Sequence, residues 1–202
     1  MSLSGKLGAD PRLNLAKTVV LIVQNNQVEL DLLGQVFIGF GVKAIRKYMS
    51  IPEADEVVKR VDFDLIVVDG DMPNGDGFEF VRRIRAEREG RNRLAPILLV
   101  AGHTPSSSVL RARDCGASFV VAKPITPKVL FDRMLWLVQD EREFVECDTY
   151  VGPDRRHKHF GPPPGMKGRR QGDLSPEVGF PAGPDLAQSE IDALLNPKKA
   201  VA

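Results

Sequence analysis

The sequence contains little cysteine and no long hydrophobic run. Only Cys115 and Cys147 occur among 202 residues, and no spacing motif links them. Two isolated thiols argue against a disulfide framework and favour a reducing compartment. No apolar run approaches the roughly 18 residues of a membrane-spanning helix, and the amino-terminal stretch lacks the apolar core of a signal peptide. We therefore expect a cytoplasmic protein without a membrane span.

A net charge is nearly absent as well. Lysine and arginine total 28, aspartate and glutamate total 27, and the formal net charge is +1. This balance gives no global attraction to nucleic acid or to anionic membranes, so only a local cluster of charges could supply one. Hydrophobic residues make up 43% of the chain, which is enough for a packed core.

The composition changes near Glu146. Eight of the fifteen prolines follow this position, and apolar residues become sparse there. Segments rich in Pro and Gly with few apolar residues are typical of irregular structure. We divide the sequence into a polar leader at 1–16, a folded domain at 17–145, a basic Pro/Gly-rich linker at 146–184, a short amphipathic helix at 185–197 and a tail at 198–202.

Strand and helix patterns alternate five times within the predicted domain. Apolar runs typical of buried parallel strands are TVVLIV, DLIVVDG, PILLVAG and SFVVAKP, while VKAIRKYM resembles an edge strand. Helical spacing follows each strand, near 28–40, 52–61, 78–84 and 109–112, and from about Thr126 to Glu143. Five such units predict an α/β domain with a doubly wound, five-stranded parallel sheet.

Polar residues follow three of these strands at the carboxyl end of the sheet. The first strand leads to Gln24 and Asn25, the third ends at Asp69, and the fifth precedes Lys123. In open α/β sheets the crevice at this end binds ligands, so we expect these side chains to lie together. A carboxylate that faces a lysine is suited to accepting a phosphoryl group, with the ammonium as counter-charge.

The run DLIVVDGDMPNGDGFEFVRRIR, with AKP after the fifth strand, resembles the central motif and the Lys-Pro signature of two-component receiver domains. The likeness covers about Lys17 to Glu143 and implies the flavodoxin-like, or CheY-like, strand order 2-1-3-4-5. It implies that Asp69 accepts a phosphoryl group and that Lys123 is the family's invariant lysine. It also implies that the backbone carbonyl of Asp71 binds Mg²⁺.

Residues that take part in metal binding and switching in that family are replaced here. Gln24 and Asn25 stand where receivers carry an acidic pair, and Ala101 stands where they carry Thr or Ser. Mg²⁺ prefers anionic oxygens, whose charge a neutral amide cannot replace. We expect the Mg²⁺ site to be lost and no cofactor to be required. The two amides are expected to hydrogen-bond Asp69 and Lys123 instead.

The segment LAQSEIDALL, residues 186–195, is a candidate amphipathic helix in which Ser189 and Asp192 have capping-box spacing. It resembles the amino-terminal peptide of the flagellar switch protein, which chemotaxis receivers bind. About ten residues do not form a stable helix alone, so docking on its own domain or on another receiver should order it. An unremarkable amphipathic turn is the alternative. The candidate contact residues are Leu186, Glu190, Ile191, Leu194 and Leu195.

Six lysines and arginines lie between Asp154 and Asp173 with no acid among them, and aromatic and histidine rings alternate with them. Guanidinium groups bind phosphates and stack on planar bases. The segment is similar in kind to the arginine-rich extension of CheY-like receivers that bind cyclic di-GMP. A solvated basic linker is the alternative. The candidate ligand-binding residues are Tyr150, Arg155, Arg156, Arg169 and Arg170.

These features predict a non-enzymatic signalling adaptor, a degenerate receiver whose basic tail binds an anionic second messenger, with cyclic di-GMP as the candidate. Its expected partners are flagellar, chemotaxis or other two-component proteins, and not nucleic acid. One alternative is a response regulator that accepts phosphate at Asp69 from a histidine kinase, in place of an Asp69 that only pairs with Lys123. A second alternative is a constitutive scaffold.

Overall fold

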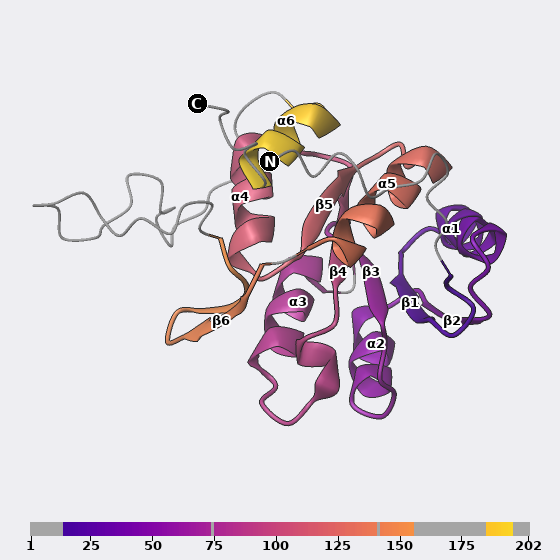
Figure 1. The fold of residues 1–202 in the computed structure, drawn as a ribbon, viewed down its shortest axis with the longest axis horizontal. Coiled ribbons are helices and arrows are strands. Elements are labelled where there is room, and N and C mark those ends of the chain that lie inside the picture. Colours follow the sequence, from indigo (N-terminus) through magenta and orange to yellow (C-terminus); the bar gives the residue numbers. More distant parts are fainter. Residues whose placement is uncertain (1–13, 74, 141, 156–184, 196–202) are drawn as a thin grey trace, which may run out of the picture.

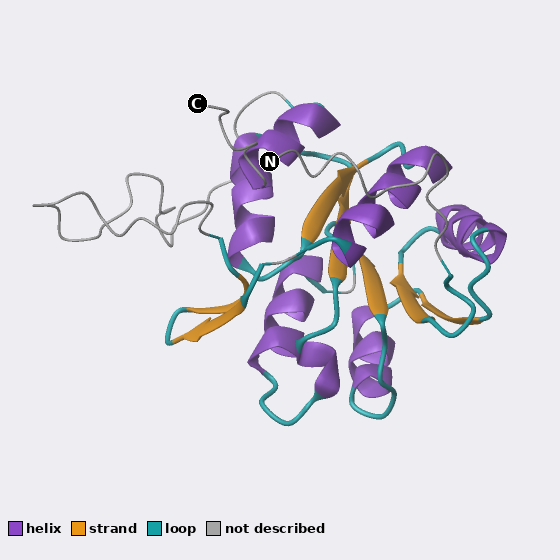
Figure 2. Cartoon of the chain, in the orientation of Figure 1, coloured by secondary structure: helices purple, strands orange, loops and turns teal. Residues whose placement is uncertain are grey.

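The computed structural model describes residues 14–73, 75–140, 142–155 and 185–195. At its centre lies a five-stranded sheet in which all neighbouring strands are parallel (Figures 1 and 2). The strands are β1 (Val19–Val23), β2 (Ala44–Tyr48), β3 (Leu65–Asp69), β4 (Ile97–Ala101) and β5 (Phe119–Ala122). Their order, β2-β1-β3-β4-β5, confirms the predicted topology.

Helices cover both faces of this sheet. They are α1 (Gln27–Gly39), α2 (Ile51–Val58), α3 (Gly77–Ala86), α4 (Ser106–Asp114) and α5 (Pro127–Val138), with a 3-10 turn, η1 (Arg91–Arg93), before β4. Phe37 of α1 and Leu130 of α5 are buried in one apolar cluster, and Phe80 of α3 is buried in the other. No helix in the described ranges is long and apolar enough to cross a membrane.

A β-hairpin follows α5 where the sequence predicted the end of a helix and an irregular linker. It consists of β6 (Phe144–Cys147) and β7 (Tyr150–Pro153), which pair in antiparallel fashion. The prediction that the last helix reaches Glu143 was therefore wrong. The helix stops earlier because Arg142 pairs with Asp140 and donates a hydrogen bond of 3.0 Å to the carbonyl of Ser118, which turns the chain back.

Close packing makes this hairpin part of the folded domain. Gly116 has φ +94°, and a Cβ atom there would lie 2.5 Å from the carbonyl oxygen of Val151. Arg85, which is 1% exposed, donates a hydrogen bond of 2.9 Å to Gly116, and its guanidinium lies 5.6 Å from the ring centre of Phe144. Burial lowers the pKa of Arg85 to about 10. The hairpin thus places folded residues, up to Pro153, past the predicted end of the domain at residue 145.

The last described element is α6 (Gln188–Leu195), which lies beside α4 at the open edge of β5 (Figure 1, yellow). Ile191 is fully buried and Leu195 is 4% exposed, and both belong to the apolar cluster that contains Val109 and Ala112 of α4. The tail segment is therefore docked on its own domain, which is one of the two arrangements that the sequence left open.

Candidate functional site

Asp69 lies at the carboxyl end of β3, a strand in which every residue is buried. Its own exposure is 1%. Oδ2 of Asp69 accepts a hydrogen bond of 2.8 Å from Nζ of Lys123, and Oδ1 accepts one of 2.9 Å from the backbone N–H of Asp71. The predicted aspartate–lysine pair is therefore formed, and both carboxylate oxygens have a partner within the protein.

Lys123 has a second acid partner, Glu29, which the sequence analysis missed. Nζ of Lys123 lies 2.7 Å from Oε2 of Glu29 and 2.8 Å from Oδ2 of Asp69. Burial opposes the charge of the ammonium, but the hydrogen bonds to Asp69 and Glu29 outweigh burial and raise the pKa of Lys123. The available signal was Asn26, whose side chain caps the amino terminus of α1 and so places Glu29 in its first turn.

The side chains of Gln24 and Asn25 hydrogen-bond Glu29 and the backbone carbonyl of Asp71, and not Asp69 or Lys123, so that prediction was wrong. Nε2 of Gln24 donates a hydrogen bond of 2.7 Å to Oε2 of Glu29, which lies between the amide and the ammonium. Nδ2 of Asn25 donates one of 3.0 Å to the backbone carbonyl of Asp71. The amides therefore position the partners of the central pair instead of joining it.

The end of β4 also borders this crevice. Ala101 is 3% exposed, and its methyl group carries no hydroxyl. At Gly102, the next residue, a Cβ atom would lie 3.9 Å from Oδ2 of Asp71 and 4.0 Å from Cδ of Lys123. Ends of four elements, β1, β3, β4 and β5, thus meet as the sequence predicted, and α1 adds Glu29.

The residues present do not fit Mg²⁺. The carbonyl of Asp71, which the family resemblance assigns to the metal, accepts a hydrogen bond from Asn25. The strand β1 delivers amides and no carboxylate, and the ammonium of Lys123 lies against Asp69. No group of three His, Cys, Asp or Glu side chains that could hold a metal occurs in the described part of the chain. Magnesium prefers anionic oxygens in octahedral geometry, and here it would have to displace the ammonium of Lys123 from Asp69 and the amide of Asn25 from the carbonyl of Asp71.

The docked segment binds the free edge of β5 through one side chain. Oε1 of Gln188 accepts a hydrogen bond of 2.8 Å from the N–H of Ala122, and Nε2 donates one of 2.9 Å to the carbonyl of Val120. An edge strand leaves such backbone groups unpaired, and the amide satisfies one donor and one acceptor together. Arg133 of α5 forms an ion pair with Asp192 of α6 on the other side.

The loop between β4 and α4 holds the start of the same segment. The N–H of Thr104 donates a hydrogen bond of 2.8 Å to Oδ1 of Asp185, and its hydroxyl donates one of 2.9 Å to the carbonyl of Leu186. The N–H of Leu186 in turn donates to the carbonyl of Thr104. Because Thr104 lies three residues after Ala101, the tail is tied to one wall of the crevice.

The predicted contact residues of this segment fall into two groups. Leu186, Ile191 and Leu195 pack against the domain, whereas Glu190 is exposed and Leu194 is 37% exposed. The expected capping pair of Ser189 and Asp192 was wrong. The helix begins at Gln188, so Ser189 lies inside it and not before it. Oε2 of Glu190 accepts a hydrogen bond of 2.8 Å from the N–H of Ala187.

Two of the candidate nucleotide-binding residues are described, and they stack on each other. The guanidinium carbon of Arg155 lies 3.9 Å from the ring centre of Tyr150 and forms an ion pair with Asp114 of α4. Tyr150 is 6% exposed, and its hydroxyl donates a hydrogen bond of 2.6 Å to the carbonyl of Pro153. A ligand that stacked on Tyr150 would have to displace Arg155. The other candidates, Arg156, Arg169 and Arg170, lie outside the described residues.

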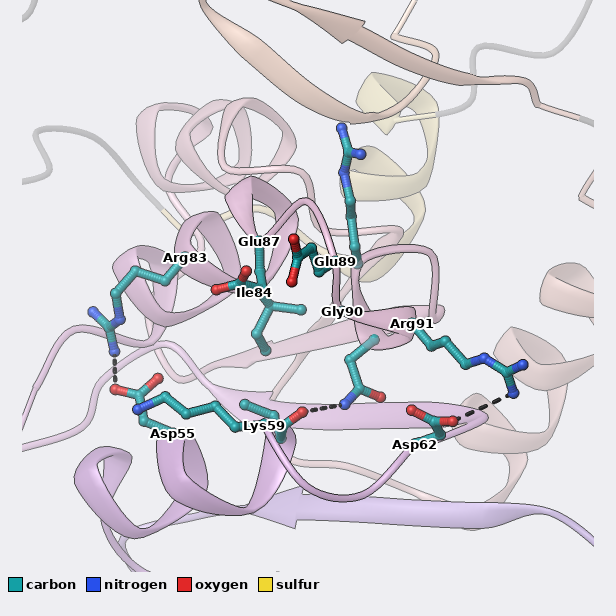
Figure 3. A pocket seen from close by; sticks show the side chains of 12 residues that line it. Asp55, Lys59, Asp62, Arg83, Ile84, Glu87, Glu89, Gly90 and Arg91 are labelled. Carbon is teal, nitrogen blue, oxygen red and sulfur yellow. Dashed lines mark hydrogen bonds and ion pairs between the residues drawn. The ribbon is translucent and has the colours of Figure 1, made fainter.

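A hollow of about 610 Å³ lies at the other end of the sheet, between α2, α3 and η1 (Figure 3). None of the residues that line it belongs to the crevice. Arg83 pairs with Asp55 at 2.6 Å and Arg91 pairs with Asp62 at 3.4 Å, as the dashed lines in Figure 3 show. Opposite charges thus neutralise each other around this hollow, and we assign no site to it.

The fold and the crevice together define a class of protein. A five-stranded parallel sheet in this order, with an aspartate at the end of β3 paired to a lysine after β5, is the architecture of a receiver-type signalling domain. Residues 20–135, more than half of the chain, match the response regulator receiver domain family. The chain belongs to this family.

Curated relatives carry names from chemotaxis and signalling. A chemotaxis protein CheY homolog of Campylobacter jejuni is 30% identical over 80 residues, which are 40% of this chain and 60% of the relative. A protein-glutamate methylesterase/protein-glutamine glutaminase 2 of Burkholderia thailandensis is 31% identical over 109 residues, which are 52% of this chain and 29% of the relative. The chain thus spans less than two thirds of the length of either protein.

Solved structures share the fold. The chemotaxis response regulator CheY4 of Vibrio cholerae superposes with a TM-score of 0.54 at 24% identity, over 58% of this chain and 96% of that one. A CheY-like receiver domain protein of Methanospirillum hungatei gives 0.55 at 19% identity, over 60% of this chain and 94% of that one. At these identities the likeness supports the fold alone.

Proposed function

We propose that this protein is a non-enzymatic signalling adaptor in which the carboxy-terminal segment, residues 185–195, covers a binding face formed by α4, β5 and α5. The observation that carries the proposal is the docking itself. Ile191 is fully buried against the domain, and the side-chain amide of Gln188 forms hydrogen bonds with the backbone of the edge strand β5. Release of the segment would expose an apolar patch and an unpaired strand edge, which are features of protein-binding surfaces.

A docked helix of this size suits reversible release. Eight of the described residues, Gln188–Leu195, are helical, and a helix of that length is not stable alone in water. Its ordered state therefore depends on its contacts with the domain, and a competing ligand or partner can shift that equilibrium. The face that it covers is the natural binding site for a second protein. The likeness of the segment to the flagellar switch peptide, and the chemotaxis names of the relatives, favour a partner in chemotaxis or flagellar control.

The proposed signal is an anionic second messenger, with cyclic di-GMP as the candidate. Its binding site would be the arginine-rich segment that begins at Arg155. Guanidinium groups offer bidentate contacts to phosphates and flat surfaces for guanine bases, and both chemistries occur in this ligand. Arg155 already stacks on Tyr150 and pairs with Asp114 of α4. A nucleotide that recruited Arg155 would pull on the same helix that α6 contacts.

Calorimetry of the full-length protein with cyclic di-GMP tests this proposal. Micromolar or tighter binding is expected, and replacing Arg155, Arg156, Arg169 and Arg170 with alanine should abolish it. A matched control replaces four exposed arginines elsewhere, Arg60, Arg82, Arg88 and Arg91, and should keep the affinity within about threefold. If the wild-type protein gives no heat, or if the control loses as much affinity as the test variant, cyclic di-GMP is not the signal.

A second candidate function is phosphoryl acceptance at Asp69. The ion pair of 2.8 Å between Asp69 and Lys123 favours it, because a nucleophile and its counter-charge are both present. Incubation with acetyl phosphate and Mg²⁺, followed by intact-mass measurement, tests this candidate. An added mass of one phosphoryl group that is absent in Asp69→Asn would support it. A constitutive scaffold is the remaining reading, and it would show neither phosphorylation nor release of α6.

A further inference from the structure

The ammonium of Lys123 is shared between two carboxylates from different parts of the chain. Nζ lies 2.8 Å from Oδ2 of Asp69 at the end of β3 and 2.7 Å from Oε2 of Glu29 in the first turn of α1. Asp69 is 1% exposed, whereas the side chain of Glu29 is 37% exposed. The crevice therefore contains an inner acid, an ammonium and an outer acid, and the outer acid is the one that solvent reaches.

Glu29 is held in this place by the residues around it. Nε2 of Gln24 donates a hydrogen bond of 2.7 Å to the same oxygen that contacts Lys123. The side chain of Asn26 accepts hydrogen bonds from the backbone at the start of α1 and so fixes the turn that carries Glu29. Leu30, the next residue, is 3% exposed and anchors this turn in the core. The amide of Gln24 thus orients an acid, and this is its role in the crevice.

We propose that Glu29 keeps an incoming anionic group out of the crevice. Its carboxylate already pairs with the ammonium of Lys123, which would otherwise balance the charge of that group. A trigonal or tetrahedral anionic group added to Asp69 needs a nearby cation to balance its charge. Lys123 is the cation that contacts Asp69 among the described residues, and Glu29 both uses one of its donors and adds a negative charge beside it. Glu29 is a positioning residue for Lys123, and this role does not depend on the proposed function of the tail.

A neutral isostere separates the charge of Glu29 from its shape. In Glu29→Gln the side-chain oxygen can still accept hydrogen bonds from Gln24 and Lys123, so the packing of the crevice is kept. Asp31→Asn is the matched control. Asp31 lies in the same helix, loses the same charge, and pairs with Lys47 at 2.9 Å, outside the crevice.

Beryllofluoride is a suitable probe, because beryllium coordinates a carboxylate oxygen while its three fluorides carry the anionic charge. Titration followed by ¹⁹F NMR, with and without Mg²⁺, would compare the full-length wild type, Glu29→Gln and Asp31→Asn. We expect Glu29→Gln to bind beryllofluoride about tenfold or more tightly than the wild type, because a negative charge beside Lys123 has been removed. The bound signal should vanish when Asp69→Asn is added, and Asp31→Asn should bind as the wild type does.

Three results would overturn the proposal. One is equal affinity in Glu29→Gln and the wild type, and a second is an equal gain in Glu29→Gln and Asp31→Asn, which would indicate a general charge effect. The third is the absence of binding in every variant while thermal unfolding shows each of them folded. The last result would mean that the amides after β1, and not Glu29, close the crevice.

Discussion

Arg133 of α5 and Asp192 of α6 form an ion pair across 59 residues of sequence, with Nη2 of the guanidinium donating to Oδ2 of the carboxylate. Arg133 is 5% exposed, and its Nε and Nη1 have no hydrogen-bond partner among the described residues. The guanidinium also lies 4.7 Å from the ring centre of Trp136. The buried guanidinium of Arg133 in the domain is thus paired with a carboxylate of the tail segment, that of Asp192.

Replacing Asp192 with asparagine should weaken the docking of α6. The substitution removes the charge that compensates Arg133, and breaking such a partly buried pair costs about 2 kcal/mol or more. Trp136 is the single tryptophan of the chain, so its fluorescence reports on the position of Arg133. We expect the emission of Asp192→Asn to shift toward that of a protein with α6 released.

The matched control for this experiment is Asp132→Asn. Asp132 also lies on α5, but it pairs with the exposed Lys128 at 2.8 Å and not with the tail. Exposed pairs of this kind contribute less than about 1 kcal/mol, so the emission of Trp136 should stay that of the wild type. Identical spectra for both variants would show that the pair of Arg133 and Asp192 does not hold the helix.

Gln188→Ala should loosen the edge of β5. The change removes the acceptor for the N–H of Ala122 and the donor to the carbonyl of Val120, at a net cost of about 1 kcal/mol for each hydrogen bond. NMR should show faster amide exchange at Ala122, by roughly tenfold. Ser189→Ala, at an exposed neighbouring position, is the control and should leave that rate unchanged. Equal rates in Gln188→Ala and the wild type would mean that the amide does not protect the strand.

The sheet could be predicted from the sequence because its strands are strongly apolar and its turns are well marked. The run LIVVD, for example, forms β3 with every residue buried, and its last residue is Asp69, at the carboxyl end as expected. Asp69 and Lys123 could be expected to meet because the carboxyl ends of all strands in a parallel sheet lie at the same edge, although β4 lies between β3 and β5.

Other features depend on tertiary contacts that local patterns do not show. Glu29 lies on a helix with no pattern that links it to Lys123, and only the folded chain brings them to 2.7 Å. The hairpin of β6 and β7 is short and contains Gly152 and Pro153, which disfavour strand in a sequence reading. It is ordered by its packing on Gly116 and Arg85.

Gly116→Ala should destabilise the whole domain. The residue has φ +94°, which costs a residue with a Cβ atom more than it costs glycine, and the added atom would lie 2.5 Å from the carbonyl oxygen of Val151. A loss of at least about 2 kcal/mol in the free energy of unfolding is expected in chemical denaturation. In Gly39→Ala the new Cβ meets no atom within 4 Å, so this control should be neutral or slightly stabilising. A loss below about 0.5 kcal/mol at Gly116 would contradict the packing of the hairpin.

The titration of Tyr150 tests the burial of the hairpin in solution. Burial raises the pKa of Tyr150 to about 12, from a usual value of 10.0. Because the folded value is raised, its contribution to stability is fully present below pH 10 and is lost as the pH rises through 12. The chain has two tyrosines, so Tyr48→Phe leaves Tyr150 alone, and its absorbance near 295 nm should titrate close to pH 12. A midpoint at pH 10 would place the ring in solvent.

We propose that the tail segment covers the face of α4, β5 and α5 and that an anionic second messenger releases it. Hydrogen–deuterium exchange of the full-length protein, with and without cyclic di-GMP, tests both parts in one measurement. We predict that residues 185–195 and β5 are protected in the free protein and that both exchange faster when the ligand is present. No such change should occur in the variant that lacks Arg155, Arg156, Arg169 and Arg170. Rapid exchange of residues 185–195 in the free protein, or protection that the ligand leaves unchanged, would contradict the account.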